Sequence, residues 1–393
     1  MLRASAGSTH GLLIILLVLM SLLGVFPLDV ILPSFPTLAR SFSVETADMA
    51  WSISLFAIGV ALSQSFLGPL SDLLGRKNLL LAGLLTAIVG AAGCIFADTY
   101  WEFLTCRLLQ AVGCGCFVLS QALVQDAYDG DKRNAMRILL TSASGVFISL
   151  SPLAGSVLEQ YFGWRGSFWS FIGLALLAMG LSLASLKQPA PSAPAGGFLV
   201  NYRALLADDR FIGYGLLSAM AFACHFAFIT VSPLLFMDHL HLGAHEFSLV
   251  FIGYGAAYIA GGLVAGVLNR RVQLPMQITA GLYLIAGAGV LLGGWVTAFG
   301  LSVTGIMLSM IVCTAGVTIL RPAATTKALE RHPQRAGSAA ALSSTLLFAV
   351  GGIVSGLIAL FDTGLPFALA ILFIVAAAFG RLVLTRAVAV QKI

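Results

Sequence analysis

The sequence predicts an all-α membrane protein whose twelve transmembrane helices form two six-helix halves. Three observations lead to this prediction: the chain is apolar almost throughout, its apolar runs match the length of membrane spans, and one loop segment recurs about half a chain later. Only 9% of the 393 residues are charged, 59% are hydrophobic, and the mean hydropathy is +0.99. A soluble domain carries about 25% charged residues, so the composition excludes an ordinary soluble protein.

A membrane-spanning helix needs about 20 predominantly apolar residues, and the chain divides into twelve runs of about that length. The first run could be mistaken for a signal peptide, but it lacks a small-x-small cleavage site and contains Asp29, so we interpret it as a retained span. These spans leave no room for a separate soluble domain. The expected spans are 11–33, 49–70, 78–97, 101–127, 135–158, 165–186, 211–236, 246–268, 274–296, 299–320, 337–361 and 364–385.

The longest polar stretch, at 187–210, is rich in Pro, Ala and Gly and divides the chain near its midpoint. We therefore expect an N-terminal six-helix bundle at 1–186, a cytoplasmic linker at 187–210 and a C-terminal six-helix bundle at 211–393. Within the linker, residues 198–206 are expected to form a short amphipathic helix on the membrane surface.

The positions of the basic residues predict the orientation in the membrane. If the amino terminus is cytoplasmic, every Lys and Arg except Arg40, Arg107 and Arg165 falls on the cytoplasmic side, including Arg321 directly after the tenth span. By the positive-inside rule both termini are then cytoplasmic. The net charge of +5 does not indicate a nucleic-acid partner, because the basic residues stand singly or in pairs between apolar runs, as they do in membrane loops.

The six cysteines all lie inside apolar runs, and none forms a CxxC pair with a second ligand cluster, so we expect them to act as small hydrophobic residues. The sequence contains no intramembrane His/Glu metal motif, no nucleophile constellation and no nucleotide-binding loop. We expect neither an enzyme nor a cofactor. The histidines at 239, 241 and 245 between spans seven and eight have spacing that could bind a metal, but no fixed motif, so a solvated loop is the favoured interpretation.

An internal repeat supports the two-half architecture. Residues 68–77 (GPLSDLLGRK), between spans two and three, correspond to residues 262–271 (GLVAGVLNRR), between spans eight and nine. Both segments begin with Gly and end in two basic residues, and Asn269 stands where the first copy has Gly75. A repeat at equivalent loops about half a chain apart predicts two parallel six-helix repeats.

The segment 68–77 also resembles the signature loop of the major facilitator superfamily. Residues 107–113 (RLLQAVG) look like the fourth-helix motif of proton-coupled members, with Ala111 where a glycine is usual. Residues 145–156 (GVFISLSPLAGS) are similar to the fifth-helix antiporter motif, with serines at 151 and 156 in place of two glycines.

Three further segments resemble the Bcr/CflA drug-resistance subfamily, which includes chloramphenicol and florfenicol exporters. They are 28–33 (LDVILP), 228–233 (FITVSP) and 336–342 (AGSAAAL). Together with the motifs above, they extend the resemblance over the whole length of the chain. The resemblance implies a major facilitator fold, a monomer, the bacterial inner membrane, and a proton-coupled antiporter that exports small drug-like molecules by alternating access. Export of a native metabolite such as a siderophore or metal chelator, and uptake by symport, stay open as alternatives. A passive channel is disfavoured.

Asp29 and Arg107 are the expected proton-coupling residues. A carboxylate near the bilayer core costs about 3 kcal/mol on insertion scales, so Asp29 should face a cavity or a partner. Arg107 is the basic residue well inside a predicted span, and it needs a carboxylate, backbone carbonyls or water around it. The family resemblance implies that Arg107 tunes the first-span acid or contacts substrate; the alternative is a structural tie between helices one and four.

The signature loop is the expected cytoplasmic gate. Gly68 allows close helix approach, Gly75 permits the tight loop, and Asp72 can accept from Arg76 or cap a neighbouring helix. Asp126, at the cytoplasmic end of span four, is a further candidate member of this gate.

The fifth span is the expected hinge, because its small residues and proline permit close packing and a bend. The hinge residues are Gly145, Pro152 and Gly155.

Polar and amphipathic residues at membrane depth are candidates for the substrate cavity; the alternative role of each is a hydrogen bond between helices. They are Gln64, Gln110, Gln121, His225, Tyr254, Tyr258 and Tyr283. The first span has Ser21, Leu22, Gly24 and Val25 where cation-exporting relatives carry a second acid, which favours a neutral, zwitterionic or anionic substrate.

Overall fold

The computed structural model of the chain describes residues 3–186, 198–269, 271–332, 335–361 and 364–389, and all regular structure in these ranges is helical. The first part of the chain forms α1 (Arg3–Leu23), α2 (Phe26–Asp29), the 3₁₀ turn η1 (Leu32–Ser34), α3 (Phe35–Phe42), α4 (Thr46–Leu74), α5 (Arg76–Phe96), α6 (Tyr100–Cys114), the 3₁₀ turn η2 (Gly115–Val118), α7 (Leu119–Ala127), α8 (Gly130–Phe162) and α9 (Arg165–Ser185). A short helix, α10 (Phe198–Leu206), follows.

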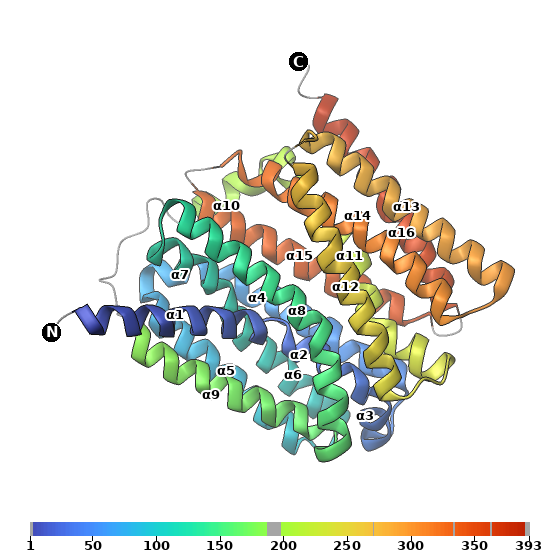
Figure 1. Ribbon diagram of the computed structural model, residues 1–393, viewed down its shortest axis with the longest axis horizontal. Coiled ribbons are helices and arrows are strands. Elements are labelled where there is room, and N and C mark those ends of the chain that lie inside the picture. The colour runs from blue at the N-terminus through green and yellow to red at the C-terminus, as the bar shows by residue number, and fades with distance from the viewer. Residues whose placement is uncertain (1–2, 187–197, 270, 333–334, 362–363, 390–393) are drawn as a thin grey trace.

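The second part of the chain repeats the pattern with fewer breaks. It forms α11 (Asp209–Pro233), the π-helical segment η3 (Leu234–His239), α12 (Ala244–Asn269), α13 (Leu274–Phe299), α14 (Val303–Leu329), α15 (Ala336–Ala359) and α16 (Leu365–Ala389). Figure 1 shows α1 to α9 packed together on one side of the molecule and α11 to α16 on the other.

The membrane prediction is confirmed by the lengths of these helices. Among the described residues, eleven helical segments are long and apolar enough to cross a membrane. The remaining predicted span, 135–158, falls within α8, whose 33 residues at 1.5 Å each give a helix of about 50 Å. That length also exceeds the thickness of the hydrocarbon core, which is about 30 Å.

Two predicted span ends fall short by nine residues each, at 33 against Phe42 and at 320 against Leu329. The first span continues past residue 33 as a broken helix that ends at Phe42, so Asp29 lies deeper in the segment than the sequence indicated. The tenth span does not end at residue 320, because α14 continues unbroken to Leu329. Arg321 therefore lies inside a membrane-spanning helix and not in a cytoplasmic loop.

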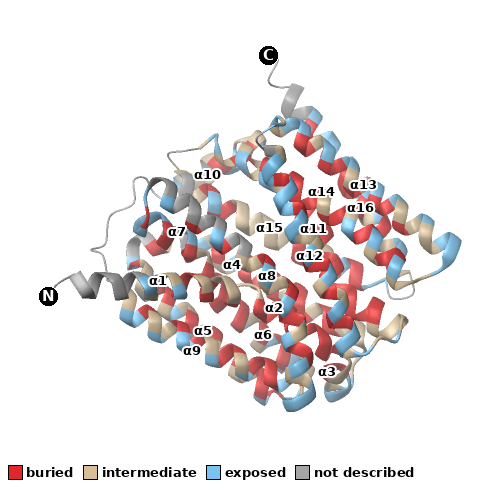
Figure 2. Cartoon of the chain, in the orientation of Figure 1, coloured by how far each residue is buried: buried red, intermediate tan, exposed pale blue. Residues whose placement is uncertain are grey.

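The burial pattern distinguishes central helices from lipid-facing ones. In the α11 segment 89% of the most apolar window is buried inside the protein, against 28% in α13. Figure 2 shows the buried residues concentrated where helices face one another, with exposed residues on the outward sides of peripheral helices such as α13. All of these helices are apolar. Whether a helix packs against protein or against lipid therefore depends on its place in the bundle and not on its composition.

The two groups of helices meet along two helix pairs, α4 with α15 and α8 with α12. Hydroxyl groups join the first pair: the Oγ atoms of Ser54 and Ser355 lie 2.9 Å apart, and Ser65 Oγ lies 3.0 Å from Thr345 Oγ1. In the second pair, Ser248 Oγ of α12 donates to the Pro152 carbonyl of α8 at 3.0 Å. Hydrogen bonds between transmembrane helices contribute about 0.6–2 kcal/mol each. A few such bonds can hold the two groups of helices together and are still weak enough for the groups to separate.

The predicted linker helix forms at the expected residues, as α10, but it is not confined to the membrane surface. Leu205 is fully buried, and the Tyr202 hydroxyl donates to the Ser65 carbonyl of α4 at 2.9 Å. Because α10 also packs against α11 and α15, it contacts both groups of helices at one end of their seam (Figure 1).

Candidate functional site

The first membrane-spanning segment is broken at its centre, and the break creates the candidate site. After α1 ends at Leu23, the chain forms the single turn α2, the turn η1 and then α3. Prolines at 27, 33 and 36 lack the backbone N–H that a continuous helix would need. Such irregular backbone is tolerated at membrane depth only where protein or a cavity surrounds it.

Asp29 is the last residue of α2 and is 3% exposed. Within the described part of the chain, no side chain or backbone group gives its carboxyl group a hydrogen bond or an ion pair. Asp29 lies within electrostatic reach of Tyr254 of α12, in the other group of helices. The structure therefore places Asp29 where the two halves face each other, without a fixed partner.

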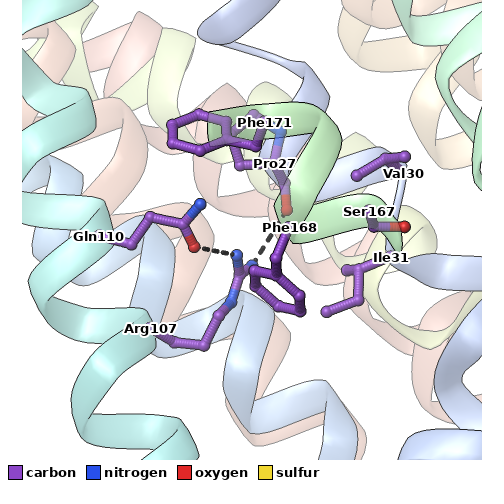
Figure 3. Close-up of a pocket in the computed structure, with 8 residues that line it drawn as sticks. All are labelled: Pro27, Val30, Ile31, Arg107, Gln110, Ser167, Phe168 and Phe171. Carbon is purple, nitrogen blue, oxygen red and sulfur yellow. Dashed lines mark hydrogen bonds between the residues drawn. The ribbon is translucent and has the colours of Figure 1, made fainter. Parts of the chain in front are cut away.

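Arg107, in α6, is fully buried, and its side chain binds the backbone of the broken segment. Its Nη2 donates to the Pro27 carbonyl at 3.1 Å and its Nη1 donates to Gln110 Oε1 at 2.8 Å (Figure 3). Its guanidinium carbon also lies 4.4 Å from the centre of the Phe56 ring. Arg107 thus reaches α2 two residues before Asp29, and no ion pair joins the two side chains in the described structure.

A cavity of about 10 Å³ lies beside Arg107, between α2, α6 and α9. Two polar atoms at this cavity, Arg107 Nε and Ser167 Oγ, have no protein partner among the described residues. The volume is about that of one water-sized probe, and the lining is polar enough for a water molecule. Figure 3 shows the lining residues, which are Pro27, Val30, Ile31, Arg107, Gln110, Ser167, Phe168 and Phe171.

Of the predicted gate residues, Arg76 and Asp126 lie in contact. Arg76, the first residue of α5, forms an ion pair with Asp126 of α7 and also donates to the Ala122 carbonyl. Gly75 between α4 and α5 has a φ of 83°, a conformation that favours glycine. The surroundings of Gly68 and the side chain of Asp72 lie outside what the structure describes.

The three predicted hinge residues all lie on α8 where it meets other helices. A Cβ atom at Gly155 would lie 2.0 Å from the Val30 carbonyl oxygen, so only glycine fits against the broken segment. Pro152 lies one turn before it and accepts from Ser248. Gly145 faces Ile259 of α12, whose Cγ1 lies 3.4 Å from the place of a Cβ.

Of the predicted cavity residues, the structure brings three together. The Tyr254 hydroxyl is hydrogen bonded to His225 Nδ1, and the two rings stack with centres 5.4 Å apart. Tyr258, one turn further along α12, has its ring centre 5.2 Å from that of His225. This cluster, on α11 and α12, lies in the second half opposite Asp29.

The other predicted cavity residues are placed differently. Gln110 accepts from Arg107, and Gln64 is buried with an unpartnered Oε1. Gln121 and Tyr283 are exposed in the structure. Tyr283 lies on the outer side of α13 with Arg381 over its ring.

Sequence reasoning missed two further features. Glu159, near the end of α8, accepts from Ser34 Oγ at 2.5 Å and from Thr37 Oγ1 at 2.6 Å, which ties α8 to the broken segment. Arg321 lies over the Phe222 ring at 5.6 Å. The hydroxyl residues after two prolines were a signal for the first contact, but no sequence signal points to the second.

The histidine-rich loop does not form a metal cluster in the described structure, which contains no group of three or more His, Cys, Asp or Glu side chains suited to an ion. Instead, Glu246 accepts from the Gly243 backbone N–H at 2.9 Å at the start of α12.

A helical bundle of this kind, with two groups of spans meeting around a broken helix, has the architecture of a membrane transporter. The chain belongs to the Major Facilitator Superfamily, whose family model matches residues 14–356. It is a multi-pass membrane protein and a transporter, not an enzyme.

Relatives by sequence support the same class. The chain is 26% identical to the uncharacterized MFS-type transporter YdgK of Bacillus subtilis, covering 92% of each chain. It is 26% identical to the Bicyclomycin resistance protein homolog of Haemophilus influenzae, covering 90% of each chain. It is also 26% identical to the Multidrug resistance protein MdtL of Escherichia fergusonii, covering 81% of this chain and 80% of the relative.

Two solved structures share the fold. A D-xylose-proton symporter superposes with a TM-score of 0.75 at 16% identity, covering 94% of this chain and 97% of the other. The human organic anion transporter MFSD10 superposes with a TM-score of 0.70 at 17% identity, covering 96% and 99%.

Proposed function

We propose that the chain is a proton-coupled exporter of small drug-like molecules in the bacterial inner membrane, with both termini in the cytoplasm. The observation that carries the proposal is the buried Asp29 carboxyl group, which has no fixed partner in the described structure and lies at the break of the first segment. Two relatives named for bicyclomycin and multidrug resistance support the choice of drugs as substrates.

The proposed mechanism follows from where Asp29 lies. Alternating movement of the two helix groups, 1–186 and 211–393, exposes the seam between them to one side of the membrane and then to the other. A carboxyl group at that seam meets a different solution in each state, so it can bind a proton from outside and release it inside. Arg107 positions Asp29, because its side chain binds the α2 backbone that carries this residue.

The driving force is sufficient for export. One proton crossing a potential of about 100 mV releases about 2.3 kcal/mol, which supports roughly a fifty-fold gradient of a neutral substrate before any pH difference is added.

The test is transport in proteoliposomes with an imposed pH gradient and chloramphenicol as the trial substrate. We expect movement that depends on the gradient and is lost in Asp29→Asn. Asp98→Asn, which changes an exposed aspartate between α5 and α6, is the matched control and should keep full activity. Full gradient-driven transport by Asp29→Asn would remove Asp29 from the mechanism. If the folded wild type does not move chloramphenicol, native metabolites such as metal chelators become the next substrates to test.

A further inference from the structure

Arg321, in the C-terminal half, is a half-buried arginine inside a membrane-spanning helix. It lies in α14 about two turns before the helix ends at Leu329, inside a segment apolar enough to span the membrane. A guanidinium group at this depth is costly unless it faces a partner or a water-filled cavity, and such residues commonly mark substrate pathways.

The Arg321 guanidinium group lies over one aromatic ring, and that ring packs against two others. The guanidinium carbon lies 5.6 Å from the centre of the Phe222 ring. Phe222 in turn stacks on Phe226, with ring centres 5.3 Å apart and planes 23° apart, and meets the Phe348 ring edge-on at 5.5 Å. We call these three rings, from α11 and α15, the aromatic wall.

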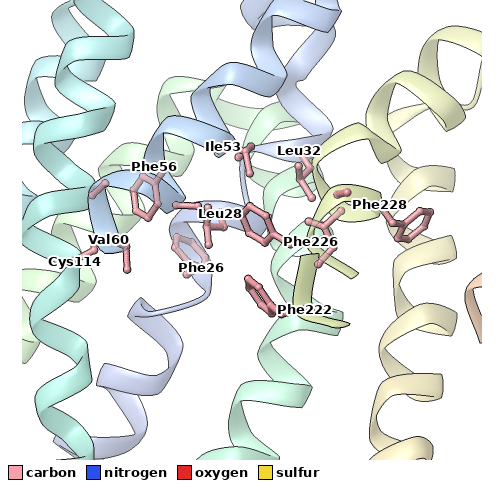
Figure 4. Close-up of a cluster of buried hydrophobic side chains, with 14 of the residues drawn as sticks. Phe26, Leu28, Leu32, Ile53, Phe56, Val60, Cys114, Phe222, Phe226 and Phe228 are labelled. Atoms are coloured by element: carbon pink, nitrogen blue, oxygen red, sulfur yellow. The ribbon is translucent and has the colours of Figure 1, made fainter. Parts of the chain in front are cut away.

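The aromatic wall faces the seam between the two halves. Figure 4 shows Phe222 and Phe226 of α11 lying opposite Phe26 and Leu28 of α2, the turn that ends in Asp29. Arg321 therefore stands beside the seam, on the side opposite the proposed proton carrier.

Arg107 and Arg321 differ in how their charge is satisfied. Arg107 is fully buried and donates two hydrogen bonds. Arg321 has no hydrogen bond or ion pair within the described residues, although it lies within electrostatic reach of His225. His225 cannot neutralise it, because an imidazole is either neutral or positive.

We propose that Arg321 and the aromatic wall form a subsite that binds the anionic group of an aromatic substrate. The inference rests on the proposed transport function and names the class of substrate that this function would serve. A carboxylate can accept two parallel hydrogen bonds from the planar guanidinium group, and these charge-assisted bonds are the strong ones. An aromatic ring attached to that carboxylate can pack edge-on against the aromatic wall at Phe348, which is partly exposed, whereas Phe222 and Phe226 are buried behind it.

The subsite predicts selectivity by charge. A substrate with an acidic group gains the pairing with Arg321, a neutral analogue of the same shape gains only the aromatic contacts, and a lipophilic cation is repelled.

The experiment compares two ligands that differ in one charge. Chloramphenicol hemisuccinate carries a carboxylate at pH 7, because such groups titrate near pH 4, whereas its methyl ester is neutral. Binding of both is measured on the full-length purified protein by titration calorimetry, for wild type, Arg321→Gln, Arg321→Lys and Arg381→Gln. Arg381 is the matched control, since it is an exposed arginine that also lies over an aromatic ring in the same half.

Wild type should bind the acid more tightly than the ester, and Arg321→Gln should weaken binding of the acid by roughly 10- to 100-fold while changing the ester little. Arg321→Lys should keep part of the preference, which also shows that the site folds, and Arg381→Gln should keep all of it. The proposal is overturned if wild type binds neither ligand, if it does not prefer the acid, or if Arg321→Gln keeps the preference.

The outcome is separable from the proposed function. Gradient-driven movement of neutral chloramphenicol, without preference for the acid in binding, would overturn the subsite and leave the exporter standing. Acid binding that depends on Arg321, without gradient-driven transport of any ligand, would do the reverse.

Discussion

Replacing Gly155 by alanine tests whether the contact between α8 and the broken first segment positions Asp29. In the structure an added Cβ would lie 2.0 Å from the Val30 carbonyl oxygen, 2.9 Å from its carbon and 3.2 Å from its Cα. These atoms are backbone and cannot turn aside as a side chain would. One of the two segments must therefore move.

The magnitude follows from two opposing terms. Overpacking of a tight contact costs about 1–3 kcal/mol, and replacing glycine by alanine inside a helix gains about 1 kcal/mol in helix propensity. Where there is no clash, only the second term acts. Gly173 of α9, with no atom within 4 Å of its added Cβ, is such a position.

The two substitutions should consequently have different effects on stability. We expect Gly155→Ala to lower the thermal unfolding midpoint in detergent and Gly173→Ala to leave it unchanged or raise it. Because Val30 directly follows Asp29, Gly155→Ala should also reduce pH-gradient-driven transport, whereas Gly173→Ala should not. If Gly155→Ala is as stable and as active as Gly173→Ala, the close approach of α8 to Val30 does not hold Asp29 in place.

Three further predictions concern contacts outside the broken segment. Gly255→Ala should destabilise the state in which α8 and α12 touch, because its Cβ would lie 2.9 Å from a backbone Cα of α8. The equilibrium constant between this state and the separated state should change by about tenfold or more. Distances between spin labels on the two halves measure this shift, and Gly262→Ala on the same helix, with nothing within 4 Å, should leave them unchanged. Arg76→Gln should slow initial transport rates more than Asp126→Asn, since Arg76 also donates to a backbone carbonyl of α7; equal rates would contradict the geometry. Asp208→Asn should lower the unfolding midpoint at pH 7 but not at low pH, which a series of melts from pH 3 to 7 would show.

The sign of the Asp208 effect follows from its contacts. Burial raises the pKa of Asp208, but the hydrogen bonds it accepts outweigh burial and hold its pKa below the ordinary aspartate value. A lowered pKa stabilises the folded state above about pH 4, and this stabilisation is lost as pH falls through the lower folded value. The donors are the side chains of Arg331 and His332 and the backbone N–H groups of Arg210 and Phe211.

The architecture could be predicted from the sequence because the bilayer imposes it. A segment in hydrocarbon must satisfy its own backbone, so a run of about 20 apolar residues reads directly as one helix. The gate pair could also be expected in part, because Arg76 and Asp126 both lie at the same predicted end of their helices. Such short-range constraints act through the chain order alone.

The positions of Arg321 and Tyr283 could not be predicted, because hydropathy does not record which way a helix faces. A charged residue ends an apolar run, so the sequence predicted a loop at Arg321, although α14 continues without a break to Leu329. Tyr283 has the same amphipathic character as Tyr254, but α13 turns it outward and α12 turns Tyr254 against His225. Lipid and protein interior are equally apolar, so only the packing of neighbouring helices separates the two cases.

The placement of Asp29 and Arg321 on opposite sides of one seam also constrains what kind of substrate can be exchanged for a proton. Coupling between two ligands is reciprocal, so exchange requires that substrate and proton weaken each other's binding. A purely anionic substrate held by Arg321 would favour a protonated Asp29, and the two would then move together. A substrate that places its acidic group at Arg321 and a hydrogen-bond donor or amine at Asp29 would instead compete with the proton. Export by antiport therefore favours aromatic molecules that carry both groups, and their binding should tighten as pH rises. Binding that tightens as pH falls would indicate co-transport of acid and proton, and with it uptake rather than export.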